Sequence, residues 1–65
     1  MKAREVIAAL RADGWIEVRI VGSHRQLRHP VKPGLVTVPI HGPRDLKIGT
    51  LVSIERQSGL NLRRR

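Results

Sequence analysis

The apolar residues change their spacing at Gly14, and this change limits the possible folds more than any other feature of the chain. Before Gly14 they follow the spacing of a helix that is buried on one side, namely Ala3, Val6, Ile7 and Leu10. After Gly14 they alternate with charged residues, as in a strand with one exposed face, namely Ile16, Val18 and Ile20. The sequence therefore predicts a helix over residues 2–13 and a strand over residues 15–21.

The next segment predicts the second strand of a hairpin. Gly22 and Ser23 form a turn signal. Residues 24–29 can then run back beside the first strand, with Leu27 as the apolar anchor. The two strands together predict an antiparallel pair.

The second half of the chain predicts one more strand and one more helix. After a loop at 30–34, the β-branched run at 35–40 predicts a strand that ends near Pro39, because proline cannot donate to a central ladder. Residues 49–58 predict a helix that stops at Gly59. Its apolar face is thinner than that of the first helix.

Three antiparallel strands with one apolar face need a cover, and two helices on that face supply it. We therefore expect one α+β domain over residues 1–65, an α-β-β-β-α two-layer sandwich with both helices on one face of a three-stranded antiparallel sheet. A chain of 65 residues is too short for a second domain. Double-stranded-RNA-binding domains adopt this architecture, which does not by itself establish a function. The predicted core is Val6, Ile7, Leu10, Ile16, Val18, Ile20, Leu27, Val36, Val38, Leu51 and Ile54.

The chain carries a large excess of positive charge. It has 13 Lys and Arg residues against 5 Asp and Glu, a formal net charge of +8. This balance predicts a polyanionic partner, and because most of the cations are arginines, nucleic acid is favoured over a membrane surface. The alternative is a charge that serves only solubility, or a basic tail. Arg63, Arg64 and Arg65 could touch phosphate, but a frayed tail is the favoured interpretation.

Composition also indicates the compartment. The chain has no cysteine, which excludes a disulfide framework and a thiolate nucleophile. Its N-terminal segment lacks the apolar core of a signal peptide, and no stretch approaches the roughly 20 apolar residues needed to cross a bilayer. We expect a cytoplasmic protein that does not bind membranes.

The segment Gly22-Ser23-His24-Arg25 places an imidazole at the mouth of a tight turn, beside a cation. An imidazole can take up or release a proton near neutral pH, as the cleavage of RNA by its own 2′-hydroxyl requires. The alternative is a turn histidine that only hydrogen-bonds the backbone, and position alone favours this alternative.

Cations on the neighbouring strands could assist His24. Alternation puts His24, Gln26 and Arg28 on the face opposite Leu27. Arg28 and Arg19 could then reach one phosphate beside the histidine. The same residues are equally well explained as a solvated outer face.

Other kinds of site receive less support. His24 and His29 would point to opposite faces of one strand, His41 lacks a paired ligand, and the carboxylates are scattered along the chain. We therefore expect no metal ion and no other cofactor. A serine-hydrolase arrangement of Ser23 and His24 is disfavoured because adjacent strand residues diverge. Trp15 is expected in the core rather than as a platform for bases.

Five short segments carry a resemblance to a known family: GW at 14–15, GSHRQLRHP at 22–30, VTVPIH at 36–41, IGTL at 48–51 and QSGL at 57–60. In order and spacing they resemble the HicA toxins of bacterial and archaeal toxin–antitoxin systems, across essentially the whole chain. The chain departs from the family pattern at Glu55 and Arg56, where the family is often more apolar, and in its terminal arginine run.

The resemblance carries expectations about fold and activity. It implies a double-stranded-RNA-binding-like fold, a metal-independent endonuclease activity on messenger RNA, and a HicB antitoxin that covers the active site. It also implies that the histidine of the family's GSH motif, here His24, is catalytic.

The leading interpretation is an endoribonuclease toxin in which His24 acts as general base or general acid. Gly22 and Ser23 would shape its turn. The candidates for phosphate binding are Arg19, Arg25, Arg28 and Lys32. The expected partners are messenger RNA and a HicB-type antitoxin, with no membrane and no small-molecule cofactor. Two alternatives stay open: a non-catalytic basic module that recognises an RNA duplex by shape, and a protein-interaction domain whose charge matches an acidic partner.

Overall fold

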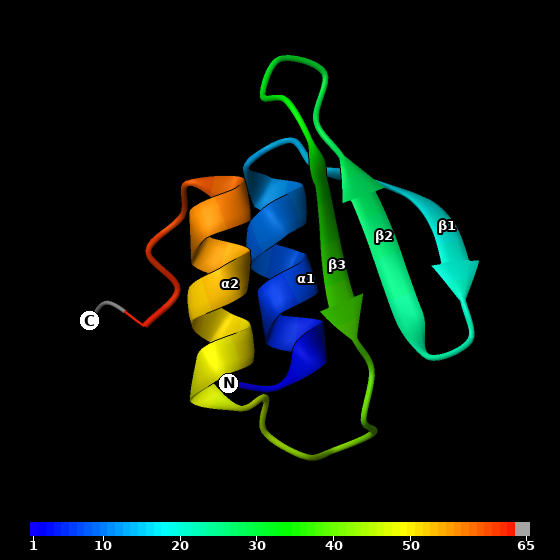
Figure 1. Ribbon diagram of the computed structural model, residues 1–65, viewed down its shortest axis with the longest axis vertical. Helices are drawn as coiled ribbons and strands as arrows, with labels where there is room; N and C mark the ends of the chain where they lie inside the picture. Colours follow the sequence, from blue (N-terminus) through cyan, green and yellow to red (C-terminus); the bar gives the residue numbers. More distant parts are fainter. Residues whose placement is uncertain (64–65) are drawn as a thin grey trace.

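The computed structural model describes residues 1–63 and contains the five predicted elements in the predicted order (Figure 1). They are α1 (Ala3–Ala12), β1 (Ile16–Val21), β2 (His24–Arg28), β3 (Leu35–Pro39) and α2 (Ile48–Ser58). Each bound lies within one residue of its prediction, so the α+β class and the element order are confirmed. No helix within the described range is long and apolar enough to cross a membrane. Arg64 and Arg65 lie outside the described residues, so the interpretation of the arginine tail stays a prediction.

The three strands form one antiparallel sheet in the order β1-β2-β3, and both helices lie on the same side of it (Figure 1). We call the side that faces the helices the inner face and the other side the outer face. Leu27, Val36 and Val38 lie on the inner face and are fully buried. The core between sheet and helices consists of Ala3, Val6, Ile7, Leu10, Trp15, Leu27, Val36, Val38, Leu46, Leu51 and Ile54.

Trp15 closes one end of this core, which confirms the place predicted for it. Its side chain is buried, and its ring meets that of His29 edge to face, with the centroids 5.3 Å apart. The indole N–H donates to the Asp13 carboxylate over 3.2 Å. Gly14 is required here, because its φ is 103° and an added Cβ would lie 2.9 Å from Nε2 of His29.

His29 is a structural histidine. Its Nδ1 accepts hydrogen bonds from the backbone amides of Val31 and Lys32, each 3.0 Å long. Its Nε2 lies 2.6 Å from the carbonyl oxygen of Asp13. This is the pattern of a neutral imidazole that carries its proton on Nε2 and donates it to that carbonyl. Both ring nitrogens therefore hold the loop after β2 against the end of α1.

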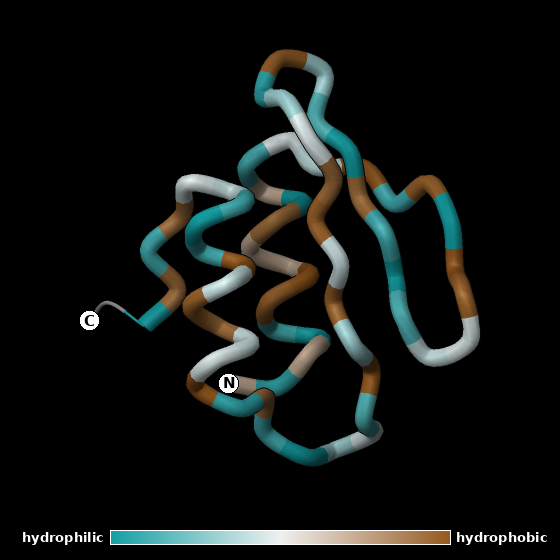
Figure 2. Tube along the Cα trace, in the orientation of Figure 1, coloured by the Kyte–Doolittle hydropathy of each residue, from teal (hydrophilic) through white to brown (hydrophobic). Residues whose placement is uncertain are grey.

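The prediction that Ile16, Val18 and Ile20 belong to the core is wrong, since their exposed fractions are 60%, 53% and 58%. One cause is the pairing of β1 with β2, whose register shifts between Glu17 and Arg19 and so breaks the strict alternation that the prediction assumed. The other cause is that the helices pack mainly on β3. Figure 2 shows the apolar segments of β1 at an edge of the sheet away from the helices.

Candidate active site

His24 is the first residue of β2, directly after the two-residue turn that joins β1 to β2. In that turn Gly22 has a φ of 59° and Ser23 has no positive φ, as in a type II′ hairpin turn, which favours glycine at its first position. His24 pairs with Val21 on one side and with Pro39 on the other. The predicted turn is confirmed, and it fixes His24 at one end of the sheet.

The His24 side chain lies on the outer face and is exposed. Within residues 1–63 its ring nitrogens form no hydrogen bond, whereas both ring nitrogens of His29 are occupied. The backbone hydrogen bond that the alternative interpretation of His24 requires is absent from this part of the structure. As far as residues 1–63 are concerned, both nitrogens of His24 are available to a ligand.

His24 lines a hollow of about 440 Å³ at this end of the sheet. The walls of the hollow come from the start of β2, the end of β3, the loop at 40–47 and the first turn of α2. The lining residues are His24, Pro39, His41, Arg44, Asp45, Leu46, Lys47 and Thr50. A second imidazole and two cations therefore share this hollow, the His24 hollow, with His24.

The loop between β3 and α2 is held at both ends. The amide of Ile40 donates to the carbonyl of Ser23, and the amide of Leu46 donates to the carbonyl of Met1, each over 2.7 Å. The Asp45 carboxylate lies 3.8 Å from the N-terminal amino group. These contacts fix the loop against the hairpin and the start of the chain, and they fix the side chains that line the His24 hollow.

The His24 hollow is electropositive. Arg44 and Lys47 are exposed, and neither pairs with a carboxylate in the described part of the chain. α2 begins directly after Lys47, and over residues 1–63 no side chain hydrogen-bonds the amides of its first turn. The backbone amides near Thr50 can therefore bind an anion. A phosphate group fits this combination of cations and free amides.

Of the predicted phosphate-binding residues, Arg19 and Arg28 share the outer face of the sheet with His24. Arg19 pairs with Gln26, which puts it on the outer face and diagonal to His24. Arg28 shares that face but stands four residues further along β2, about 13 Å away in an extended strand. Neither Arg19 nor Arg28 lines the His24 hollow, so the predicted clamp of both arginines is not formed in that hollow.

Arg25 and Lys32 lie elsewhere, and their assignment to the His24 site is corrected. Arg25 is on the inner face, where its guanidinium donates to the Glu17 carboxylate over 3.2 Å. Lys32 belongs to the β2–β3 loop, which lies at the opposite end of the sheet from the β1–β2 turn (Figure 1). Its Nζ is 2.6 Å from the Asp13 carboxylate and 3.0 Å from the carbonyl of Ser58. The ammonium group ties the β2–β3 loop to both helices. Its hydrogen bond also holds the pKa of Asp13 below the usual value.

His41, Arg44 and Lys47 were not predicted as site residues. They belong to a loop, where neither helical nor strand periodicity gives a signal. The register of β3 on β2 explains their position. Pro39 pairs with His24, so the chain after Pro39 passes beside the hairpin turn. The Gly22-Ser23 turn sets the register of β1 on β2 only, so the position of His41 follows from the separate register of β3 on β2.

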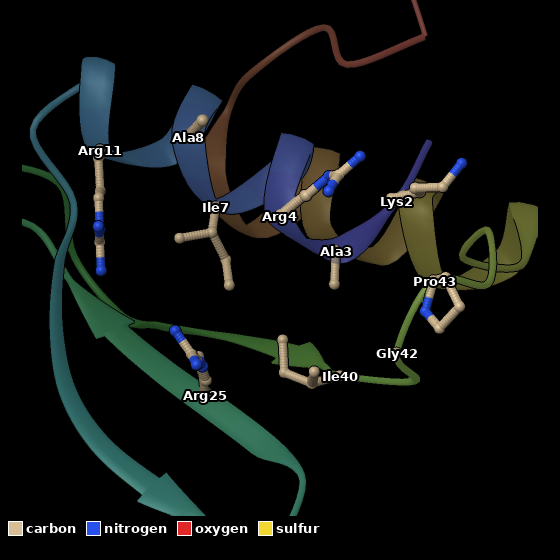
Figure 3. A pocket seen from close by; sticks show the side chains of 10 residues that line it. All are labelled: Lys2, Ala3, Arg4, Ile7, Ala8, Arg11, Arg25, Ile40, Gly42 and Pro43. Carbon is tan, nitrogen blue, oxygen red and sulfur yellow. The ribbon is translucent and has the colours of Figure 1, made fainter.

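A second pocket, of about 420 Å³, lies between α1 and the inner face (Figure 3). It is lined by the cations Lys2, Arg4, Arg11 and Arg25 together with Ala3, Ile7, Ala8, Ile40, Gly42 and Pro43. We call it the cationic pocket. The four cations can hold an anion. Among residues 1–63 no histidine lines the cationic pocket, so this part of the chain offers it no group that exchanges protons near neutral pH. The loop that includes Ile40 and His41 separates the cationic pocket from the His24 hollow.

The fold and the His24 hollow define the class as a small basic α+β protein with an accessible histidine beside exposed cations. Comparison with known families is more specific, because the family model for the HicA toxin of bacterial toxin–antitoxin systems matches residues 3–60. The chain therefore belongs to the HicA toxin family, and its role is that of a toxin in a toxin–antitoxin system. A search of curated proteins finds no match.

Proposed function

We propose that this toxin is a metal-independent endoribonuclease that cuts messenger RNA, with His24 as its catalytic residue, and that a HicB-type antitoxin inhibits it. The observation that carries the proposal is an exposed histidine with both ring nitrogens free, set in an electropositive hollow. Membership of the HicA family supports the same assignment.

RNA contains its own nucleophile, so the protein has to supply only proton transfer and charge stabilisation. As the 2′-oxygen attacks phosphorus, its proton passes to a base. The bond between phosphorus and the 5′-oxygen breaks, and an acid gives a proton to that oxygen. The products are a 2′,3′-cyclic phosphate and a 5′-hydroxyl. His24 performs one of the two proton transfers, and Arg44 and Lys47 stabilise the negative charge on the phosphate.

Metal independence is supported by the placement of the possible ligands. Within residues 1–63 no three His, Asp or Glu side chains come together as ligands of a metal ion would. Among residues 1–63, Asp45 supplies the only carboxylate in the lining of the His24 hollow, and this carboxylate lies 3.8 Å from the N-terminal amino group. Side-chain acids and bases are thus the groups that the hollow offers to RNA.

Inhibition by a HicB-type antitoxin is supported by the toxin–antitoxin pairing that the family implies and by the surface of β1. Ile16, Val18, Ile20 and Val21 are exposed on this edge strand. Exposed apolar side chains that gather on one edge favour contact with another protein. An antitoxin seated there would lie beside the hairpin turn that carries His24.

The experiment compares the purified wild-type chain with His24→Ala on one messenger RNA in excess EDTA. Arg28→Ala is the matched control, because it removes a cation from the same strand and face outside the His24 hollow. We expect His24→Ala to bind RNA but to cut it about 10²–10⁴ times more slowly than wild type. Arg28→Ala should cut at close to the wild-type rate. Equal cutting by wild type and His24→Ala would refute the role of His24.

A non-catalytic RNA-binding module is the second candidate, and the cationic pocket favours it. Four cations line that pocket without any histidine, so RNA could bind there with no reaction. In the same experiment this candidate predicts equal binding by wild type and His24→Ala, with no cutting by either. Substitution of Arg4 and Arg11 by Ala would then weaken binding.

A further inference from the structure

A second histidine faces the site of the proposed reaction. His41 lines the same hollow as His24 and is exposed. Over residues 1–63 its ring nitrogens form no hydrogen bond, so His41 resembles His24 and differs from His29, whose ring is fully engaged. Two of the three histidines therefore line one hollow, and no residue in the range 1–63 hydrogen-bonds their rings.

The strand pairing explains why they meet. Pro39 pairs with His24, and the antiparallel pattern continues one residue further, because the Ile40 amide donates to the Ser23 carbonyl over 2.7 Å. Alternation then turns Ile40 toward the cationic pocket, which it lines, and His41 toward the His24 hollow. His41 is diagonal to His24, and diagonal α-carbons in such a pair are about 7–8 Å apart, within reach of aromatic side chains.

We propose that His24 and His41 form an acid–base pair in which one imidazole takes the proton of the 2′-hydroxyl and the other protonates the departing 5′-oxygen. This inference rests on the proposed function, which by itself requires only His24. The cleavage needs two proton transfers on opposite sides of one phosphate, and a single imidazole supplies one of them at a time. No further reactant is required, because the proton lost by the 2′-oxygen is balanced by the proton gained by the 5′-oxygen.

The charged groups around the pair suit this role. Arg44, Asp45 and Lys47 from the loop line the hollow with the two histidines, and α2 contributes only the uncharged Thr50. Arg44 and Lys47 can hold the phosphate between the two imidazoles, as cations do for a transferring phosphoryl group. The Asp45 carboxylate is directed to the N-terminal amino group, 3.8 Å away, which limits its repulsion of the phosphate.

The first test is the cleavage rate of His41→Ala and His41→Gln as a function of pH, beside wild type and Arg28→Ala. His41 is exposed, so we expect both substitutions to keep the fold. Thermal unfolding of the variants at the wild-type temperature serves as the control. We expect a bell-shaped dependence of kcat/KM on pH for wild type. The His41 variants should lose one limb of the bell, with kcat lowered about 10²–10⁴-fold and RNA affinity nearly unchanged. Wild-type cutting by His41→Ala, or a bell that keeps both limbs, would overturn the pair.

A substrate with sulfur in place of the bridging 5′-oxygen then assigns the two roles. Sulfur leaves without protonation, so loss of the general acid costs little on this substrate. We expect cleavage of the sulfur substrate to be restored in only one of the two variants, His24→Ala or His41→Ala. The restored variant is the one that lacks the general acid. Restoration of both variants or of neither would contradict a division of labour between the histidines.

The outcomes separate this inference from the proposed function. If wild type cuts, His24→Ala does not and His41→Ala does, the function stands and the pair fails. If wild type leaves RNA intact in all conditions, the proposed function itself fails.

Discussion

The backbone amide of Ile40 donates a 2.7 Å hydrogen bond to the carbonyl of Ser23, and this bond extends the β2–β3 pairing to the two segments that carry the candidate catalytic residues. Ser23 precedes His24 in the hairpin turn, and Ile40 precedes His41 in the loop after β3. The geometry of the turn should therefore control both stability and cleavage.

Gly22→Ala should destabilise the chain by about 1–2 kcal/mol, since the φ of 59° at this position strains any residue with a Cβ. The added methyl group meets nothing within 4 Å, so the loss comes from the backbone alone. Gly49→Ala is the matched control, because Gly49 lies in α2 and also has open space. Alanine favours a helix, so Gly49→Ala should raise the free energy of unfolding by about 0.5–1 kcal/mol. Urea unfolding measures both, and a shift of the same sign for the two variants would contradict the turn geometry.

Lys32→Gln should lower Tm and leave RNA affinity nearly unchanged. The Lys32 ammonium binds Asp13 and the carbonyl of Ser58 at the end of the sheet remote from His24. Its loss removes ties within the fold rather than a contact with phosphate. Calorimetry and an RNA titration of the same sample separate the two effects. Weaker RNA binding at unchanged Tm would contradict this prediction and would indicate that Lys32 binds the substrate.

The acid side of the stability profile should depend on two carboxylates. The hydrogen bond from Lys32 lowers the pKa of Asp13, and hydrogen bonds from the side chain and the backbone of Arg63 lower the pKa of Glu55. Because each pKa is lower in the folded state, the stabilisation is complete above the ordinary values near pH 4 and is lost as pH falls through the lowered ones.

The double variant Asp13→Asn, Glu55→Gln should therefore have a lower Tm than wild type near neutral pH and a smaller loss of Tm on acidification. Thermal scans from about pH 6 to about pH 2 measure the difference. Parallel curves for the two proteins would show that these carboxylates do not carry the acid sensitivity.

Substitutions on β1 and β2 should differ sharply in their effect on stability. Leu27 is fully buried, and Leu27→Ala should cost about 2–5 kcal/mol. Ile20 is 58% exposed, and Ile20→Ala should change the free energy of unfolding by no more than about 0.5 kcal/mol. A large loss for Ile20→Ala in urea unfolding would place β1 in the core after all.

The elements could be predicted from the sequence because each has its own local signal. The helical spacing before Gly14 defined α1, and Gly59, which has a φ of 76° at the end of α2, marked the helix stop. The burial of β1 could not be predicted from alternation, because the register shift at Glu17 and the position of the helices depend on contacts between distant segments. The sequence pattern of each strand does not indicate which strand of the sheet the helices will cover.

Only the part of the candidate site that has a local sequence signal could be predicted. His24 stands beside a turn with a clear local signature, so the sequence pointed to it. Arg25 and Lys32 carried the right charge, but their partners, Glu17 and Asp13, come from distant parts of the chain. His41 is in a loop, and only the pairing of β3 with β2 brings it to the site.

In the proposed reaction, the 2′-hydroxyl of RNA attacks the adjacent phosphate, and His24 assists by proton transfer. The most direct test is the analysis of product ends after incubation of one sequence, made as RNA and as its 2′-O-methyl form, with wild type and with His24→Ala in EDTA. We expect wild type to cut only the unmodified RNA and to leave a 2′,3′-cyclic phosphate and a 5′-hydroxyl, while His24→Ala cuts that RNA about 10²–10⁴ times more slowly. Cutting of the 2′-O-methyl strand, fragments with a 5′-phosphate, or undiminished cutting by His24→Ala would contradict the proposed reaction.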